Sequence, residues 1–210
     1  MKKLVMFFTL VLVTLGMSAS VMAEGEDPYK LIQRVAESTF KRIAADQAII
    51  QVDPNHLKTV VSEELMPYIN HRLAAKMVLG KSKATKAQKK AFYVAFKGYL
   101  ITTYATVFTK YTNQKVIFEP ARPIKGKKVV TVKTRIKDEA RPDIHIDFKV
   151  RLNKKTGVWK AYDMVAEGIS LLNSKKAELK SLLRQQGGVA DVTRLLIEKA
   201  KLNIKGVSAA

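Results

Sequence analysis

Cysteine is missing from this chain, which excludes disulfide bonds and lipid attachment through cysteine. The 210 residues include none, so the protein forms no disulfide bond and carries no acyl chain on an N-terminal cysteine. Its stability must therefore come from an ordinary apolar core. Apolar residues make up 47% of the chain, which is enough for such a core and argues against an intrinsically disordered protein.

A hydrophobic run long enough to cross a membrane comfortably is also missing. The apolar run from Leu4 to Leu15 falls short of the usual ~20 residues. Lys2 and Lys3 precede it, and Val21 and Ala23 follow it at the spacing of a cleavage site. This pattern predicts a cleaved secretory signal peptide at residues 1–23 and a single mature domain at residues 24–210. The mature chain would have 187 residues (210 minus 23) and a charge of +18 (20 minus two lysines).

Acidic residues are scarce, with 18 Asp and Glu against 38 Lys and Arg and a formal charge of +20. Between Glu64 and Glu119, 54 residues include ten basic side chains and no carboxylate. A surface of one sign attracts anionic partners, and an exported protein meets lipid headgroups or acidic protein patches rather than nucleic acid. We expect partner docking through Lys86, Lys89 and Lys90. A solvated face that only keeps the protein soluble is the alternative.

Apolar residues in the first half of the chain recur every three or four positions, which predicts helices. Three helix starts are marked by a capping residue or a proline: Asp27-Pro28, Asp53-Pro54 and Pro67. The third helix is expected to end at Gly80. Thr85 and Gln88 have the spacing of a capping box and open a long, aromatic-rich helix to about residue 111.

From Val116 the apolar period changes to two, which is typical of half-buried antiparallel strands. Long strands are predicted around residues 130–136 and 144–152, and another runs through Trp159 and Tyr162 after a turn. Helical spacing returns from Ile169, and Gly187-Gly188 separates two final helices. Helices, a four-stranded meander and helices again predict an α+β fold, with the helices on one face of the sheet and a wet, basic opposite face.

Motifs for catalysis, nucleotides or metals are weak. Gly80-Lys81-Ser82 imitates the end of a P-loop, but Ala75 stands where the first glycine belongs. The three histidines lack the spacing of a metal site, so we expect no metal. Tyr162 and Asp163 could form an acid–base pair, although strand neighbours point to opposite faces and an aspartate at a strand end more often binds backbone amides. An enzyme is therefore not the expected function.

The residues from Trp159 to Ser170 read W-x-A-Y-D-x-x-x-E-G-x-S, a pattern long enough to be specific. Shorter stretches accompany it at residues 27–31, 64–68, 78–80 and 91–96. Together they resemble the toluene-tolerance (MlaC) family of periplasmic phospholipid carriers in Gram-negative bacteria. The resemblance spans nearly the whole mature chain.

This resemblance implies a fold, a location and partners. The fold is a cone like that of nuclear transport factor 2, whose helices close over a curved sheet around a cavity for the acyl chains of a glycerophospholipid. In the periplasm, family members act between an outer-membrane lipoprotein–porin complex (MlaA with porin) and an inner-membrane ABC transporter with a hexameric MCE-domain protein (MlaD). They maintain outer-membrane lipid asymmetry. The cargo phospholipid is the only small molecule implied, no cofactor is, and a monomer is expected.

A lipid carrier needs a dry, uncharged cavity. Two acyl chains of about 15 methylenes each hold on the order of 20 kcal/mol of hydrophobic free energy, all of which a bilayer already supplies. We expect the inward apolar residues of strands and helices to provide the cavity. The predicted lipid-binding residues are Leu73, Met77, Tyr104, Phe108, Val132, Ile136, Ile144, Ile146, Phe148, Val150, Met164 and Ile169.

Two other functions stay open. A periplasmic envelope adaptor would have a filled core and bind anionic partners through its basic face alone. An isomerase- or hydrolase-like enzyme on the same fold would hold a buried carboxylate or tyrosine with a shifted pKa in a smaller pocket. Phospholipid that co-purifies with the protein would distinguish a carrier from both.

Overall fold

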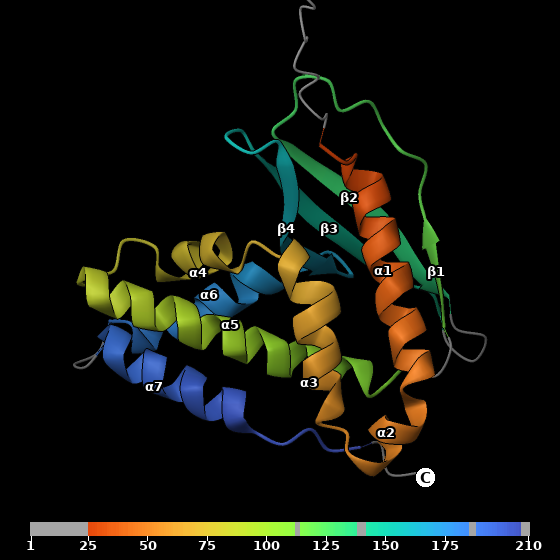
Figure 1. The fold of residues 1–210 in the computed structure, drawn as a ribbon. Coiled ribbons are helices and arrows are strands. Elements are labelled where there is room, and N and C mark those ends of the chain that lie inside the picture. Colours follow the sequence, from red (N-terminus) through yellow and green to blue (C-terminus); the bar gives the residue numbers. More distant parts are fainter. Residues whose placement is uncertain (1–24, 112–113, 138–141, 185–187, 207–210) are drawn as a thin grey trace, which may run out of the picture.

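The computed structural model describes residues 25–111, 114–137, 142–184 and 188–206. The predicted signal peptide and Gly187 lie outside these residues. Helices come first along the chain, then an antiparallel sheet, then helices again (Figure 1). The predicted α+β fold, with its helices on one face of the sheet, is confirmed.

The first helix begins where its capping residue predicts. The carboxylate of Asp27 accepts hydrogen bonds from the backbone N–H groups of Tyr29 and Lys30, which satisfies two donors at the start of α1 (Pro28–Ala45). A short helix that the sequence analysis did not predict, α2 (Gln47–Val52), follows it.

The second predicted helix begins two residues after Pro54, as α3 (His56–Val60). It continues directly into a π-helical turn, η1 (Val61–Leu65). Such turns are rare and occur frequently near functional sites.

The third predicted helix begins four residues later than expected. Met66–Tyr68 form a single 3₁₀ turn, η2, and Ile69 is extended and bridges to Ala161 in the sheet. The backbone N–H of Asn70 then donates to the carbonyl of Ala161 at 2.7 Å, and the Asn70 side chain caps α4 (His71–Leu79). Backbone pairing with the sheet therefore displaces the helix start.

The capping box is present. Thr85 Oγ1 accepts from the N–H of Gln88 at 3.1 Å, and Gln88 Oε1 accepts from the N–H of Thr85 at 2.9 Å. The helix that it opens, α5 (Lys86–Phe108), ends three residues before the predicted end and is about 35 Å long at 1.5 Å per residue. It packs along α7 (Gly188–Lys201), where Gly98 permits a close approach because a Cβ there would lie 3.2 Å from that of Ala200.

Within the described ranges, the sheet has five strands in chain order, each antiparallel to the next: β1 (Lys115–Phe118), β2 (Val129–Lys137), β3 (Ile144–Asn153), β4 (Val158–Ala166) and β5 (Ile169–Ser170). The two-residue β5 adds to the predicted meander. The prediction that helical structure resumes at Ile169 is wrong, because Ile169 pairs with Ala166 and Ser170 caps α6 (Leu171–Leu182). Positive φ angles at Glu167 (47°) and Gly168 (77°) turn the chain back onto β4.

The two sheet faces differ as predicted. Exposed basic side chains such as Lys133 and Arg151 stand on the outer face. On the inner face, one end of the sheet packs tightly against α1 (Figure 1). The buried residues of this sheet–α1 core are Leu31, Ile32, Val35, Val130, Val132, Val150 and Trp159.

Two further cores lie beside the sheet–α1 core. One joins α4, α5, α6 and α7 through residues such as Phe92, Phe96 and Leu196. The other joins α1, α3, η1 and α5 with Ile204 from the C-terminal segment. The apolar interior is therefore divided into three cores, and α5 belongs to two of them.

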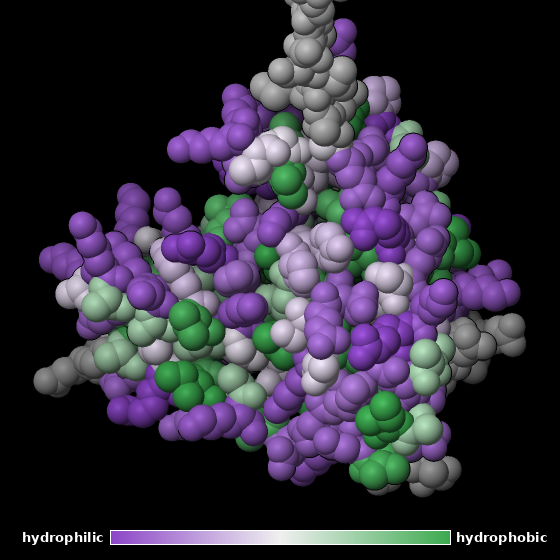
Figure 2. All heavy atoms as spheres, in the orientation of Figure 1, coloured by the Kyte–Doolittle hydropathy of each residue, from purple (hydrophilic) through white to green (hydrophobic). Residues whose placement is uncertain are grey.

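The face of the molecule drawn in Figure 2 is mainly hydrophilic. On the face drawn in Figure 2, apolar side chains form separate groups among hydrophilic ones, and hydrophilic side chains gather over α4 and the start of α5. Lys86, Lys89 and Lys90 are exposed there. None of the helices in the described ranges is both long and apolar enough to span a membrane.

Removing the capping box should weaken the fold measurably. Thr85→Ala leaves the N–H of Gln88 without its acceptor, and we expect the free energy of unfolding to fall by about 1 kcal/mol. Urea denaturation followed by circular dichroism measures the change. Thr85→Ser, which keeps the hydroxyl, is the matched control and should retain most of the stability. Equal stability of the alanine variant and the wild type would show that the box does not anchor α5.

Candidate functional site

An apolar cavity of about 160 Å³ lies between the inner face of the sheet and the helices that cover it. Strands β1 to β4 form one wall, and α1, α5 and the η1–η2 segment form the other. The apolar and aromatic residues of its lining include Ile32, Val35, Phe40, Leu65, Tyr68, Tyr104, Phe108, Val116, Ile136, Ile146, Phe148 and Met164. We call this space the sheet cavity.

Six of the twelve residues predicted to bind lipid line the sheet cavity. They are Tyr104, Phe108, Ile136, Ile146, Phe148 and Met164. They come from α5, β2, β3 and β4, so the structure brings together residues up to 60 positions apart (104 to 164).

The other six predicted residues do not line this cavity. Val132 and Val150 are buried under α1 in the sheet–α1 core, because that helix covers their end of the sheet. Leu73 and Met77 lie on α4, whose buried residues belong to the core shared with α5, α6 and α7. Ile144 and Ile169 are at the surface, 40% and 62% exposed.

Several lining residues were not predicted. Ile32, Val35 and Phe40 come from α1, and Leu65 and Tyr68 come from the η1–η2 segment. The three- and four-residue period did place the α1 residues on an inward face. It could not distinguish an inward residue that meets another side chain from one that meets a cavity.

The two threonine hydroxyl groups in the wall are already hydrogen-bonded to the backbone. Thr39 Oγ1 donates to the carbonyl of Val35 at 2.7 Å, and Thr134 Oγ1 donates to the carbonyl of Ile146 at 2.7 Å. Neither hydroxyl needs a partner inside the cavity. The wall therefore behaves as an apolar surface even where its residues are polar.

Asp163 is the carboxylate in the lining, and its hydrogen bonds explain its position. Its side chain is 3% exposed, and its oxygens accept from Ser170 Oγ at 2.8 Å and from the N–H of Leu172 at 3.1 Å. Lys149 Nζ lies 3.5 Å away. The aspartate thus caps α6, which is the structural role expected for it and leaves no free oxygen pair for acid–base work.

Tyr162 and Asp163 both line the sheet cavity, as do their neighbours Ala161 and Met164. The β3–β4 register is irregular at this point, because Val150 pairs with Ala161 but the preceding Lys149 pairs with Asp163. Tyr162 is the extra residue of this bulge, and a bulge changes the alternation of side chains. The strict alternation assumed for this strand therefore does not hold here.

The rest of the W-x-A-Y-D-x-x-x-E-G-x-S stretch forms the corner that follows β4. A Glu167 carboxylate oxygen accepts from the N–H of His145 and so links this corner to β3. Gly168 occupies the left-handed region at φ 77°, where glycine is preferred. The polar members of this motif therefore shape the β4–β5–α6 corner beside the cavity.

Tyr104 differs from the other polar lining residues. Burial raises its pKa to about 12, and the nearby Asp163 carboxylate adds to the shift. Among the described residues its hydroxyl has no hydrogen-bond partner. A buried tyrosine hydroxyl usually has one, so packing alone holds this side chain in place.

Aromatic side chains pack where α1 and α5 end. The ring of Phe40 stacks on that of Tyr111 at 4.5 Å between centroids and meets the edge of Phe108 at 5.9 Å. Phe40 and Phe108 both line the sheet cavity. Each such pair contributes about 0.5–1.5 kcal/mol beyond simple burial.

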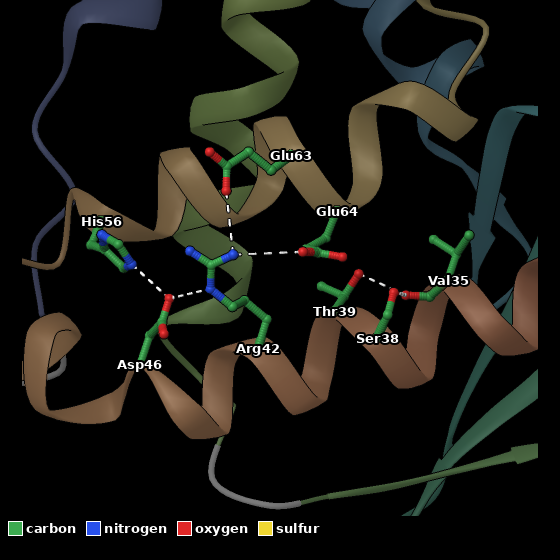
Figure 3. A network of polar contacts seen from close by, with 8 residues as sticks. All are labelled: Val35, Ser38, Thr39, Arg42, Asp46, His56, Glu63 and Glu64. Atoms are coloured by element: carbon green, nitrogen blue, oxygen red, sulfur yellow. Dashed lines mark hydrogen bonds and ion pairs between the residues drawn. The ribbon is translucent and has the colours of Figure 1, made fainter.

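A polar network behind the helical wall ties α1 to α3 and η1 (Figure 3). Asp46 Oδ2 lies 2.7 Å from His56 Nε2 and 2.6 Å from Arg42 Nε. Arg42 also reaches Glu63 at 3.3 Å and Glu64 at 3.7 Å. This network fixes the end of α1 whose Thr39 and Phe40 line the cavity.

In the described part of the chain, no cluster of three or more His, Asp or Glu side chains could hold a metal ion.

Two sequence comparisons with known proteins agree on one family. Residues 33–198 match the family model described as MlaC protein. The chain is 33% identical over 198 residues to the intermembrane phospholipid transport system binding protein MlaC of Haemophilus influenzae, covering 93% of this chain and 92% of that protein. It is also similar to the solved structure of the phospholipid-binding protein from Ralstonia solanacearum in complex with a phospholipid, with a TM-score of 0.73, 21% identity, and coverage of 83% of this chain and 97% of the other. That structural likeness shows a shared fold.

The Asp46 network should weaken in acid. Its hydrogen bonds to His56 and then Arg42 lower the pKa of Asp46 from the ordinary 3.8. A carboxylate with a lowered pKa stabilises the fold above its unfolded pKa and loses that effect as the pH falls through its folded pKa. Urea unfolding should therefore show Asp46→Asn less stable than the wild type at pH 7, with the gap closing as the pH falls below about 4. A gap of the same size at pH 7 and pH 3 would contradict this role.

Proposed function

The chain belongs to the MlaC family, and we propose on that basis that it carries glycerophospholipids through the periplasm with their acyl chains enclosed in the sheet cavity. The observation that carries the proposal is the cavity itself. Its walls are apolar and aromatic, the threonine hydroxyls in them are hydrogen-bonded to backbone carbonyls, and Asp163 is engaged by Ser170 and Leu172. Such a cavity suits a hydrocarbon chain and offers little to a polar substrate.

The energetics favour a cargo in this space. An unfilled apolar cavity of about 160 Å³ costs roughly 4 kcal/mol at ~24 cal/mol per Å³. Acyl chains that fill it restore the lost packing and gain about 0.8 kcal/mol for each buried methylene. A filled core, which an envelope adaptor would have, shows no such space.

A carrier with this architecture acts passively. The chain holds no nucleotide motif, and Gly80-Lys81-Ser82 lies at the end of α4 rather than after a strand. The direction of transport then depends on partners that bind the loaded and empty forms differently. The proposed partners are an outer-membrane lipoprotein–porin complex and an inner-membrane ABC transporter with a hexameric MCE-domain protein, and the proposed role is to maintain outer-membrane lipid asymmetry.

Export is part of this proposal. We assign residues 1–23 to a cleaved signal peptide and residues 24–210 to the mature lipid-binding domain. N-terminal sequencing of the protein from a periplasmic extract tests the boundary, and a chain that still begins at Met1 would contradict it.

Placing a charge in the cavity should abolish lipid loading. Ile146→Arg puts a guanidinium into an apolar lining whose carboxylate, Asp163, is already engaged by Ser170, Leu172 and Lys149. We expect bound phospholipid to fall at least about tenfold without unfolding. The measurement is mass spectrometry of the lipid released when protein from a periplasmic extract is denatured, with circular dichroism to check the fold. Wild-type protein should release near-stoichiometric diacyl phospholipid.

Ile169→Arg is the matched control, because Ile169 is 62% exposed and lies outside the cavity lining. It introduces the same charge and should keep wild-type lipid content. Normal lipid in both variants would reject the cavity as the binding site. Stable wild-type protein without lipid would reject the carrier and return the adaptor and enzyme alternatives.

Docking should depend on the exposed lysines at the start of α5. Reversing Lys86, Lys89 and Lys90 to Glu should weaken binding to either membrane complex at least about tenfold at low salt and leave lipid loading unchanged. Surface plasmon resonance at several salt concentrations measures the effect. Reversal of Lys125, Lys127 and Lys128, which are exposed between β1 and β2, is the control with equal charge change. Wild-type binding that does not vary with salt would contradict electrostatic docking.

A further inference from the structure

A second cavity lies beside the sheet cavity, further toward the start of α5. It has a volume of about 250 Å³ and is lined by residues of α4, α5, α6 and β4. Its inner part is apolar, with Ala74, Phe96, Leu100 and Leu172 in the lining. Because α5 and α6 enclose most of it, we call it the α5–α6 cavity.

The two cavities share one wall. Five residues line both of them: Ile69, Tyr104, Tyr162, Asp163 and Met164. Asp163 is fixed by its hydrogen bonds to Ser170 and Leu172, whereas Tyr104 has no hydrogen-bond partner among the described residues. A rotation of the Tyr104 side chain would therefore break no hydrogen bond. Met164, which lines the same wall, has a flexible, unbranched side chain. The partition is thus weakest at Tyr104 and Met164.

The sheet cavity alone is too small for a diacyl lipid. An apolar cavity of about 150 Å³ holds one benzene molecule, which has six carbon atoms. At about 160 Å³ the sheet cavity has room of the same order, whereas the two acyl chains of a membrane phospholipid have about 30 methylenes. Loading therefore needs additional apolar space, and the α5–α6 cavity is adjacent.

We propose that the α5–α6 cavity is a second chamber of the lipid site, which receives acyl chain when Tyr104 and Met164 move out of the partition. This inference rests on the proposed lipid-carrier function. The second chamber then makes lipid affinity depend on acyl chain length. Short chains fit within the sheet cavity, whereas long chains must continue past Tyr104.

Charged side chains occur in the second chamber but are paired with each other. Lys175 forms an ion pair with Glu178, and its ammonium group lies 5.0 Å from the centroid of the Tyr99 ring. Lys175 is partly exposed and Glu178 is exposed, so this pair lies at the solvent side of the chamber. The apolar inner part, next to the partition, is left for hydrocarbon.

Filling the second chamber should change chain-length selectivity. Leu100 lines the α5–α6 cavity but not the sheet cavity, so Leu100→Trp reduces the second chamber alone. Delipidated protein is titrated with dibutanoyl phosphatidylethanolamine, whose two chains have six carbons beyond their carbonyl groups, and with dipalmitoyl phosphatidylethanolamine. We expect the variant to bind the dipalmitoyl lipid at least about tenfold more weakly than wild type and the dibutanoyl lipid within about twofold. Val94→Trp, on the same helix at a site 68% exposed, is the matched control and should bind both lipids as wild type does.

The outcomes separate this inference from the function on which it rests. Wild-type affinity of Leu100→Trp for both lipids would overturn the second chamber and leave the carrier function intact. Wild-type protein that binds neither lipid would overturn the carrier function itself.

A measurement on the wild type covers the case in which Leu100→Trp does not fold. Phosphatidylethanolamine with a diazirine at the middle or at the end of a long acyl chain is loaded and photolysed, and the labelled peptides are identified by mass spectrometry. Label in α6, which lines only the second of the two cavities, supports the proposal. Label confined to α1, β2 and β3 with both probes overturns it.

Discussion

The architecture depends on one constraint: the apolar walls of the sheet cavity must stay apart, although their burial against each other would be favourable. Side chains that face a void lose their dispersion partners, so a protein core ordinarily collapses to fill it. Here the walls belong to different cores. The sheet is anchored to the first half of α1, the η1–η2 segment to α3 and the C-terminal segment, and α5 to α4, α6 and α7. Each wall is held from behind, and the sheet cavity lies where the cores meet.

The polar groups are arranged to leave this space dry. The hydroxyls of Thr39 and Thr134 donate to backbone carbonyls, and the carboxylate of Asp163 accepts from the backbone N–H of Leu172 at the start of α6. Most of the charge is instead on the outside, in the basic outer face of the sheet and the lysines at the start of α5. The proposed lipid binding and the proposed electrostatic docking use different parts of the molecule, so the two can vary independently.

The most specific stretch of the sequence stands at the junction of the two cavities. Tyr162, Asp163 and Met164 line both, and Tyr162 is the extra residue of a bulge in β4. Glu167, Gly168 and Ser170 then turn the chain through β5 into α6. The polar residues of this stretch thus hold the corner in shape, while its neighbours form the partition that Tyr104 completes from α5. No catalytic role is needed to account for them.

The sequence by itself determined most of the long helices and strands and many of their inward residues. Capping by Asp27 and the box of Thr85 and Gln88 are local, and the change from a three- and four-residue period to a period of two marks the sheet. Local patterns do not say what stands opposite an inward residue. Val132 and Ile136 share a strand face, yet α1 covers the first and the second meets the cavity. The late start of α4, the strand at Ile169 and the bulge at Tyr162 were likewise decided by pairing with β3 and β4, because partners distant in the chain fix backbone hydrogen bonds that local spacing leaves open.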